Sequence, residues 1–125
     1  MADITWSKTV DAPHYAAAYN YLSLKYSPEV AKTLVQQLKG AKLTTRPARD
    51  ILRASKLKPL RKKDSGVQRE AEKVEQGKPL QPVLVLSLPI GADIADGYHR
   101  ISLAYLDSDE TPVPCKIITP DALYG

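Results

Sequence analysis

The sequence predicts a fold of the mixed α/β or α+β class, in which helices flank a small sheet. Three observations support this prediction. After residue 41, apolar runs of strand length are interspersed with amphipathic stretches of helix length. The two apolar runs before Asp96 are joined by a short turn, so we expect them to pair antiparallel. The run at 113–118 follows a helical stretch, so it should return by a crossover and can lie parallel to an earlier strand.

The first forty residues predict two helices that form an antiparallel pair against the rest of the chain. The first helix has Asp11 as a candidate cap and Pro13 in its first turn. The second has Ser27 as its cap and Pro28 at its first position. It should end at Gly40, in the left-handed conformation that favours glycine.

The segment from 42 to 77 predicts a short strand, a loop and one clear helix. Residues 42–45 can begin a strand, whereas 48–55 fits either a short helix or a strand. Pro, Gly and charged residues then mark a loop. Asp64 or Ser65 caps the next helix, at about 66–76, and Gly77 ends it.

The remaining elements follow directly along the chain. QPVLVLSL, at 81–88, is a continuous apolar run and predicts a buried strand. A turn at PIGA leads to a second strand at 92–95, and the Asp96-Gly97 pair closes that strand. A helix at 99–106 and a final strand at 113–118 complete the fold.

The composition is that of a single domain of 125 residues, 43% of them hydrophobic. We expect residues 1–41 to be a helical extension packed on a core formed by 42–125. No apolar run approaches the ~20 residues that span a bilayer, and the start of the chain lacks the pattern of a signal peptide. We therefore expect no membrane partner and a cytoplasmic location. The single cysteine, Cys115, falls on a predicted buried strand and reads as a small hydrophobic residue.

The whole chain has a net charge of +4, and its positive charge is concentrated in one segment. Between Arg46 and Lys63 the only acidic residue is Asp50, against eight cationic side chains: Arg46, Arg49, Arg53, Lys56, Lys58, Arg61, Lys62 and Lys63. This asymmetry is compatible with a phosphate-bearing partner, and an ordinary solvated loop explains it equally well.

Aromatic residues and one histidine near the start of the chain admit simpler structural roles. Trp6 and four tyrosines most simply serve helix packing, and a surface for stacking bases is the alternative: Tyr15, Tyr19, Tyr21 and Tyr26. His14 has no Cys, His or acidic cluster around it in the sequence, so we expect an ordinary, partly exposed residue.

The stretch IADGYHRISLAY, at 94–105, is the strongest candidate for a functional site. A strand that turns into a helix at Gly97 exposes unpaired backbone N–H groups, and the helix dipole favours an anion there. Arg100 can donate two parallel hydrogen bonds to phosphate, and His99 can donate a proton or act as a general acid or base. Asp96 can cap the helix, hold a metal ion or accept a proton. Tyr98 can stack on a base or pack on the core, and we favour packing.

The segments GKPLQPVLVL, IADGYHRISLAYL and VPCKII resemble the core of the ParB/sulfiredoxin-like superfamily. In that superfamily a helix ending in Gly leads to a Pro-hydrophobic strand. A hairpin strand then leads to a Gly-x-x-Arg loop, its helix and a closing Val-Pro strand. The resemblance covers about residues 42–119. It implies the ParB/sulfiredoxin-like fold for this part, with the N-terminal helical pair added to it.

The resemblance also implies a nucleotide site, because the Gly-x-x-Arg loop of these proteins binds nucleotide phosphates. Partition proteins bind cytidine triphosphate there, sulfiredoxin uses ATP, and a group of free-serine kinases has an Asp-Gly-His-x-Arg loop. By position, Gly97 and Arg100 match the shared phosphate-loop residues, and His99 stands where sulfiredoxins have His. Asp96 matches the kinase Asp implicated in phosphoryl transfer. Arg61 lies where ParB proteins carry an Asn-Pro-Arg segment and is a second expected phosphate contact.

Three departures from the pattern of the superfamily narrow the expected activity. Sulfiredoxin needs a cysteine where this chain has Tyr98, and Cys115 lies elsewhere, so we do not expect sulfiredoxin chemistry. ParB proteins have Glu-Arg-Arg in place of Tyr98-His99-Arg100, which argues against hydrolysis of cytidine triphosphate. The helix-turn-helix domain that follows the core in ParB proteins has no counterpart among these residues, so we expect no reading of a centromere-like sequence.

Three functions remain open from the sequence. The first is a ParB-like module that binds a nucleotide, such as a nucleoside triphosphate, or a nucleic-acid phosphate through Gly97, Tyr98, His99, Arg100 and Arg61. The second is a magnesium-dependent phosphotransferase or nuclease in which Asp96 and His99 are catalytic, because phosphoryl transfer depends mainly on positioning and charge. The third is a non-catalytic module that binds a protein partner through its N-terminal helices. We favour the first.

Overall fold

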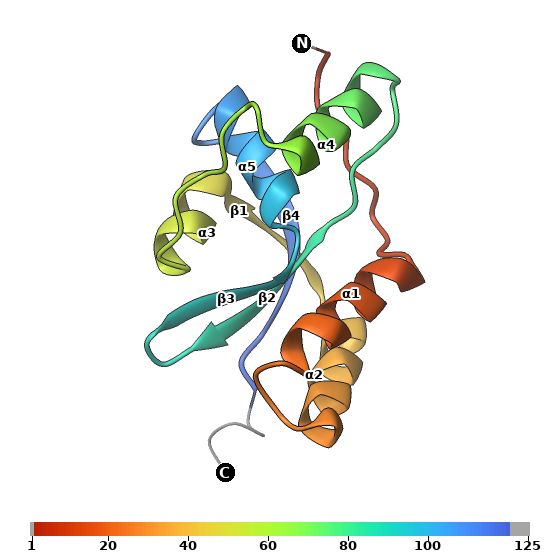
Figure 1. Cartoon of the computed structure of the whole chain (residues 1–125), viewed down its shortest axis with the longest axis vertical. Coiled ribbons are helices and arrows are strands. Elements are labelled where there is room, and N and C mark those ends of the chain that lie inside the picture. Colours follow the sequence, from red (N-terminus) through yellow and green to blue (C-terminus); the bar gives the residue numbers. More distant parts are fainter. Residues whose placement is uncertain (1, 121–125) are drawn as a thin grey trace.

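The computed structural model describes residues 2–120 and has a mixed α+β fold, as predicted (Figure 1). Five helices and four strands follow one another along the chain. Their bounds are α1 (Ala12–Leu22), α2 (Pro28–Gly40), β1 (Leu43–Pro47), α3 (Ala48–Ala54), α4 (Ser65–Glu75), β2 (Val83–Leu88), β3 (Gly91–Asp96), α5 (Tyr98–Asp107) and β4 (Pro112–Ile118).

The four strands form one mixed sheet in the order β1-β4-β2-β3. The β2–β3 hairpin is antiparallel, as its short turn predicts, and β4 returns after α5 to lie parallel to β2. β1 pairs antiparallel with β4 and forms one edge of the sheet, while β3 forms the other edge. Both predicted pairings, the hairpin and the parallel return, are therefore confirmed.

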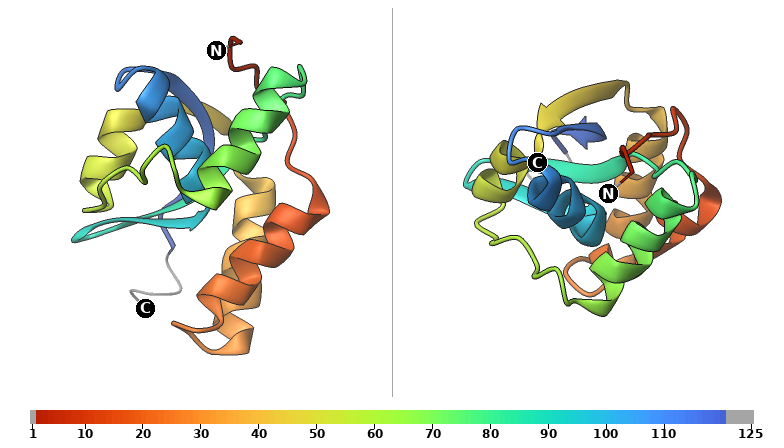
Figure 2. Two further views of the ribbon diagram at one scale, coloured as in Figure 1. Left: turned by 45° about the horizontal axis from the view of Figure 1, so that its top comes forward. Right: turned by 90° about the horizontal axis from the view of Figure 1, so that it is seen from above.

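Different helices cover the two faces of the sheet (Figure 2). On one face α1 and α2 lie side by side and pack on Leu84, Leu86 and Ala95. On the other face α3 and α5 pack on Val83, Val85, Ile94, Val113 and Cys115. Side chains that alternate along β2 thus serve two separate cores, which is why its apolar run is continuous.

A third apolar cluster lies between α4 and α5, away from the sheet. It consists of Val67, Val74, Leu80 and Leu103, and the partly buried Ile4 and Trp6 pack against it. Trp6 also forms an isolated parallel bridge with Leu80, so the segment before α1 runs beside the segment that enters β2. Trp6 thus packs in the core, although against α4 and α5 rather than the helical pair.

Three helix ends test the sequence-based prediction. The prediction for Gly40 is wrong, because Gly40 is the last helical residue of α2 and does not have a positive φ. Gly77 does follow α4 with φ of 74°. The segment 48–55, which fitted either a helix or a strand, forms the helix α3. Lys56, just after it, has a φ of 57°, a left-handed conformation that the sequence did not indicate.

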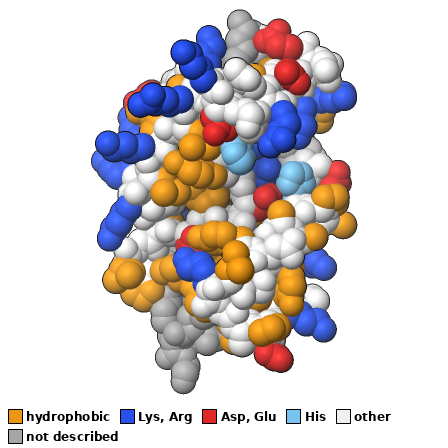
Figure 3. Space-filling view, in the orientation of Figure 1, with side chains coloured by type: hydrophobic (Ala, Val, Ile, Leu, Met, Phe, Trp, Pro, Cys, Tyr) orange, Lys and Arg blue, Asp and Glu red, His pale blue; other side chains and the backbone are white. Residues whose placement is uncertain are grey.

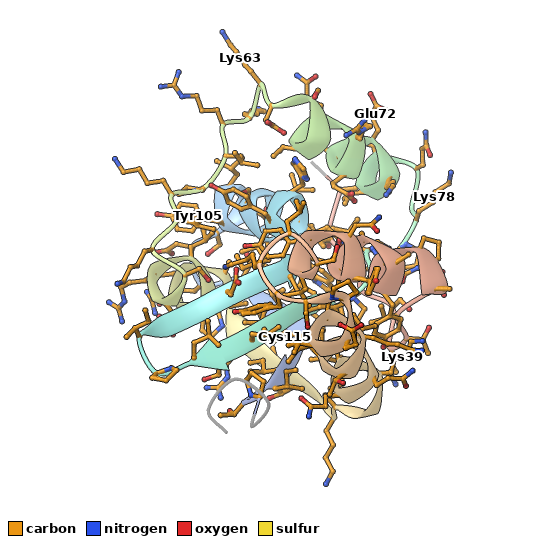
Figure 4. The ribbon with its side chains drawn as sticks, turned by 60° about the horizontal axis from the view of Figure 1, so that its bottom comes forward. Lys39, Lys63, Glu72, Lys78, Tyr105 and Cys115 are labelled. Atoms are coloured by element: carbon orange, nitrogen blue, oxygen red, sulfur yellow. The ribbon has the colours of Figure 1, made fainter. Side chains whose placement is uncertain are left out.

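Cys115 is fully buried within the sheet, as predicted (Figure 4). Burial raises the pKa of its thiol to about 11, although the nearby Arg46 acts in the opposite direction. In the part of the chain from 2 to 120, no helix combines the length and apolar character needed to cross a bilayer.

Candidate phosphate-binding site

A bulge in β3 decides where the Asp96 side chain points. Leu84 lies opposite Asp96, but the next residue, Val85, lies opposite Ile94, so Ala95 is an extra residue on β3. Leu84 belongs to the core under α1 and α2, so its partner Asp96 is turned toward the same side. Without the extra residue, strict alternation would turn Asp96 toward α5 and α3.

Asp96 binds two cationic or ionisable side chains from different elements. Its Oδ2 lies 2.9 Å from Nη2 of Arg100 and 2.9 Å from Nδ1 of His14. An ionised carboxylate only accepts hydrogen bonds, so we assign the proton of the His14 contact to Nδ1. Burial alone would raise the pKa of Asp96, but the hydrogen bond from His14 and the charge of Arg100 more than offset it and hold that pKa below 3.8.

Arg100 points into the protein and is only 5% exposed. Its Nε donates to the carbonyl of Gln81 at 2.9 Å, and Nη2 donates to the carbonyl of Pro82 at 3.2 Å as well as to Asp96. Nη1 lies 3.4 Å from Nδ1 of His14. The guanidinium thus joins α5, the entry to β2, the end of β3 and α1.

Two carboxylates of β3 hold α1 against the edge of the sheet. Near the start of the helix, His14 contacts Asp96, as described. Near the other end of the helix, the hydroxyl of Tyr21 donates to Asp93 at 2.7 Å. Lys25, which follows the helix, places its Nζ 2.6 Å from Asp93. The hydrogen bond to Asp93 is the main cause that raises the pKa of Lys25. The pKa of Tyr21 is also raised, first by burial and then by Asp93.

The N-terminus of α5 lies directly after this bulged strand. Gly97 is its N-cap, with φ of 124°, and no side chain caps the helix. A Cβ atom at this position would lie 2.4 Å from Val83 Cγ1, so both the backbone conformation and the packing require glycine. The first amides of α5 therefore have no acceptor from a capping side chain.

The His99 ring packs against the start of α4, not against the sheet. A Cβ atom on Gly66 would lie 2.2 Å from His99 Cδ2, so the absence of a side chain at 66 gives the ring its place. His99 Nε2 lies 3.6 Å from Oδ1 of Asp64, the carboxylate that caps α4 by accepting from Val67 N. About half of the His99 side chain is exposed.

Tyr98 attaches the basic loop to this site. Its ring packs against the core under α3 and α5, as favoured above, and its hydroxyl donates to the carbonyl of Lys58. The basic loop, defined here as residues 56–63, carries five exposed cationic side chains: Lys56, Lys58, Arg61, Lys62 and Lys63. Figure 3 shows Lys and Arg side chains gathered on the side where this loop runs.

Two of the three cationic residues before the loop, Arg49 and Arg53, are compensated, whereas Arg46 forms no ion pair in the described part of the chain. Arg49 lies within 4 Å of Asp50, Asp109 and Glu110, and Arg53 lies 3.8 Å from Asp50. In residues 2–120 the five cations of the basic loop also take part in no ion pair, so the uncompensated positive charge of this part of the sequence lies on the loop and on Arg46.

A cleft of about 510 Å³ opens beside the end of β3 and the start of α5. Asp96, Gly97, Tyr98 and His99 line it together. The remaining lining residues come from α1, β3 and the segment after α3: Tyr21, Asp93, Ile94, Ala95, Ala92, Ser55 and Leu57. Arg100 lies beneath this group instead of in the wall, and Arg61 belongs to the loop outside the lining.

A magnesium ion in the cleft would have to compete with cationic side chains for both lining carboxylates, Asp93 and Asp96. Within the described range, no three His, Cys, Asp or Glu side chains come together as a potential metal site. Asp96 is the carboxylate expected to hold magnesium, and its Oδ2 already accepts hydrogen bonds from both Arg100 and His14. It does not cap the helix either, because Gly97 is the N-cap and no side chain accepts from the first amides.

Sequence reasoning missed His14, Asp93 and Gln81. His14 is only partly exposed, as expected, but it contacts both Asp96 and Arg100. Gln81 contributes a carbonyl to Arg100 and exchanges two hydrogen bonds with Asp11 at the start of α1. No local pattern signals these contacts, because His14 and Asp96 are 82 residues apart.

We compared the chain with protein-family models, curated proteins and solved structures, and no match was found in any of the three. The ParB/sulfiredoxin-like resemblance therefore stays a prediction based on the motif and on the order of the elements.

Proposed function

We propose that the protein binds a phosphate-bearing ligand, a nucleotide or a nucleic-acid phosphate, in the cleft at the N-terminus of α5. The observation that carries this proposal is the uncapped start of α5, at Gly97, in the wall of an open cleft of about 510 Å³. Backbone N–H groups at such a position point toward a bound anion, and the helix dipole adds a partial positive charge.

The basic loop supplies the charge that the cleft itself lacks. Asp93 and Asp96 line the cleft, but Lys25 and Arg100 compensate these carboxylates. The attraction for an anion therefore comes from the exposed loop cations and from the helix terminus. Tyr98 fixes this loop through the carbonyl of Lys58, close to where the anion would sit.

Within this proposal Arg100 is a positioning residue. Its guanidinium has internal acceptors from Gln81, Pro82 and Asp96, so it holds the end of β3 and the start of α5 in place. His99, half exposed in the cleft wall, is the side chain placed to donate to a phosphate oxygen.

We favour binding over catalysis at this site. A general base works best when its pKa lies near the working pH, whereas the pKa of Asp96 is held below 3.8. Oδ2 of Asp96 also already accepts hydrogen bonds from His14 and Arg100.

Thermal shift with a panel of nucleoside triphosphates, inorganic triphosphate and a short single-stranded oligonucleotide tests the proposal. A ligand present at 100 times its Kd adds about 2.7 kcal/mol to the free energy of unfolding, which a melting curve resolves. The double variant Lys58→Glu/Arg61→Glu should lose most of the shift. The matched control, Lys8→Glu/Lys32→Glu, changes the net charge equally at exposed positions outside the loop and should keep it.

Two results would contradict the proposal. One is the absence of a shift with every phosphate ligand at low ionic strength, where exposed charges act most strongly. The other is an equal loss of the shift in the loop variant and in its control, because binding would then reflect net charge rather than this cleft.

A further inference from the structure

A second cavity lies away from the phosphate site, in a groove between α4 and α5. Its volume is about 750 Å³, and apolar side chains from both helices form its floor: Val67, Ala71, Leu103 and Leu106. Leu106 is 43% exposed, so this floor is open to solvent at the α5 side. An apolar groove between two helices has the shape that an amphipathic helix fills.

The rim of the groove is acidic, although the chain as a whole has a net charge of +4. Glu72, Glu75 and Asp107 stand on the rim, against the single cation Lys62. None of the three carboxylates forms an ion pair in the described part of the chain. Figure 4 shows the labelled Glu72 side chain extending outward from α4.

A segment of the chain itself already packs beside this groove. Ile4 and Trp6 pack against the cluster that contains Val67 and Leu103, and the amide of Ala2 donates to Glu75 at 3.0 Å. An extended segment with two apolar anchors and a donor to an acidic side chain is thus accommodated beside α4. The groove shares Val67, Leu103 and Glu75 with this contact and extends it with Leu106, Glu72 and Asp107.

We propose that the groove between α4 and α5 is a docking site for an amphipathic helix of a partner protein that carries Lys or Arg beside its apolar face. The apolar residues of that helix contact Leu103, Leu106 and Ala71, and its cations lie against Glu72, Glu75 and Asp107. The charge complementarity of the rim selects a basic partner and disfavours an acidic one. This site goes beyond the proposed function and is independent of the cleft at α5.

Fluorescence anisotropy with a designed peptide tests the proposal on the full chain. The probe is a labelled peptide with leucines spaced three and four residues apart and lysines elsewhere. A scrambled peptide of identical composition keeps the charge but loses the apolar face. The variant Glu72→Lys/Asp107→Lys should weaken binding of the ordered peptide about tenfold or more, and the variant Leu106→Glu should do the same through the apolar floor. The matched control, Glu29→Lys/Glu110→Lys, reverses two exposed carboxylates that do not line the groove and should bind as the parent does.

The outcomes are distinct. Tight binding of the ordered peptide, lost in both groove variants and kept in the control, supports the proposal. Equal affinity for the scrambled peptide, an unchanged affinity in the groove variants, or no binding at low salt overturns it. A parent protein that is dimeric by light scattering and becomes monomeric on Leu106→Glu also overturns it, since a second copy would then occupy the groove.

Discussion

Nη2 of Arg100 and Oδ2 of Asp96 lie 2.9 Å apart, with both side chains at least 85% buried. Asp96 is the last residue of β3, and Arg100 lies in the first turn of α5. The pair therefore spans the junction that creates the cleft. His14 of α1 contacts both side chains, so these three residues connect β3, α5 and α1.

We predict that Arg100→Met strongly destabilises the protein. The substitution leaves the Asp96 carboxylate buried without its main counter-charge, and the loss of one partner of such a pair costs about 3–5 kcal/mol. Urea denaturation measures the change in the free energy of unfolding. The double variant Asp96→Asn/Arg100→Met should recover part of the loss, because it leaves no buried charge unpaired. A stable Arg100→Met protein that loses only ligand binding would show that Arg100 contacts the ligand instead.

The stability contribution of Asp96 should depend on pH in a defined direction. Its pKa in the folded protein lies below the ordinary 3.8, so the folded state binds protons less readily than the unfolded chain does. The contribution is fully present above pH 3.8 and is lost as the pH falls through the lower, folded value. Melting curves from pH 7 to pH 2 should show the gap between the parent and Asp96→Asn narrowing only below about pH 4. A gap that narrows already between pH 7 and pH 5 would contradict this assignment.

Gly66→Ala should displace the His99 ring while leaving the protein folded. The added methyl would lie 2.2 Å from His99 Cδ2, but the ring is half exposed and can rotate outward. Alanine within a helix gains about 1 kcal/mol over glycine, which offsets the cost of the displacement. Imidazole NMR signals should therefore shift for His99 and stay in place for His14. Gly40→Ala is the control, since a Cβ there meets nothing within 4 Å. Unchanged His99 signals would refute the close approach.

The Cys115 thiol should be inert in the native protein. It is completely buried, and its pKa is raised to about 11, so almost no reactive thiolate forms near neutral pH. An aromatic disulfide reagent should label it slowly in buffer and rapidly in denaturant, with the native rate set by opening of the structure. Rapid labelling at pH 7 without denaturant would contradict the described packing. Because the chain has one cysteine, the reagent reports this site alone.

The secondary structure could be predicted from the sequence because its signals are local. Ser27 and Pro28 mark the start of α2, and in the structure Ser27 accepts from Val30 N as a cap should. Gly97 lies at the turn from strand to helix, as predicted, and has a φ of 124°. The segment 48–55 stayed ambiguous because seven helical residues are too few to show a period.

The site was harder to predict because its geometry depends on contacts between distant segments. Gly97, Tyr98, His99 and Asp96 do lie together, as neighbours in sequence would. The inward direction of Arg100 could not be foreseen, because it is set by the carbonyls of Gln81 and Pro82 and by the bulge at Ala95. A β-bulge has no signature in this strand, whose residues at 94 and 95 fit regular alternation equally well.

The way α1 lies along β3 has a consequence for how the chain can be divided. Leu84, Leu86 and Ala95 are covered by α1 and α2, and β3 is an edge strand. A fragment beginning at residue 42 would present this apolar face together with an unshielded strand edge, the combination that promotes intermolecular β-pairing. The helices α1 and α2 therefore shield the sheet from intermolecular pairing, and an expression fragment made without them should accumulate as aggregate.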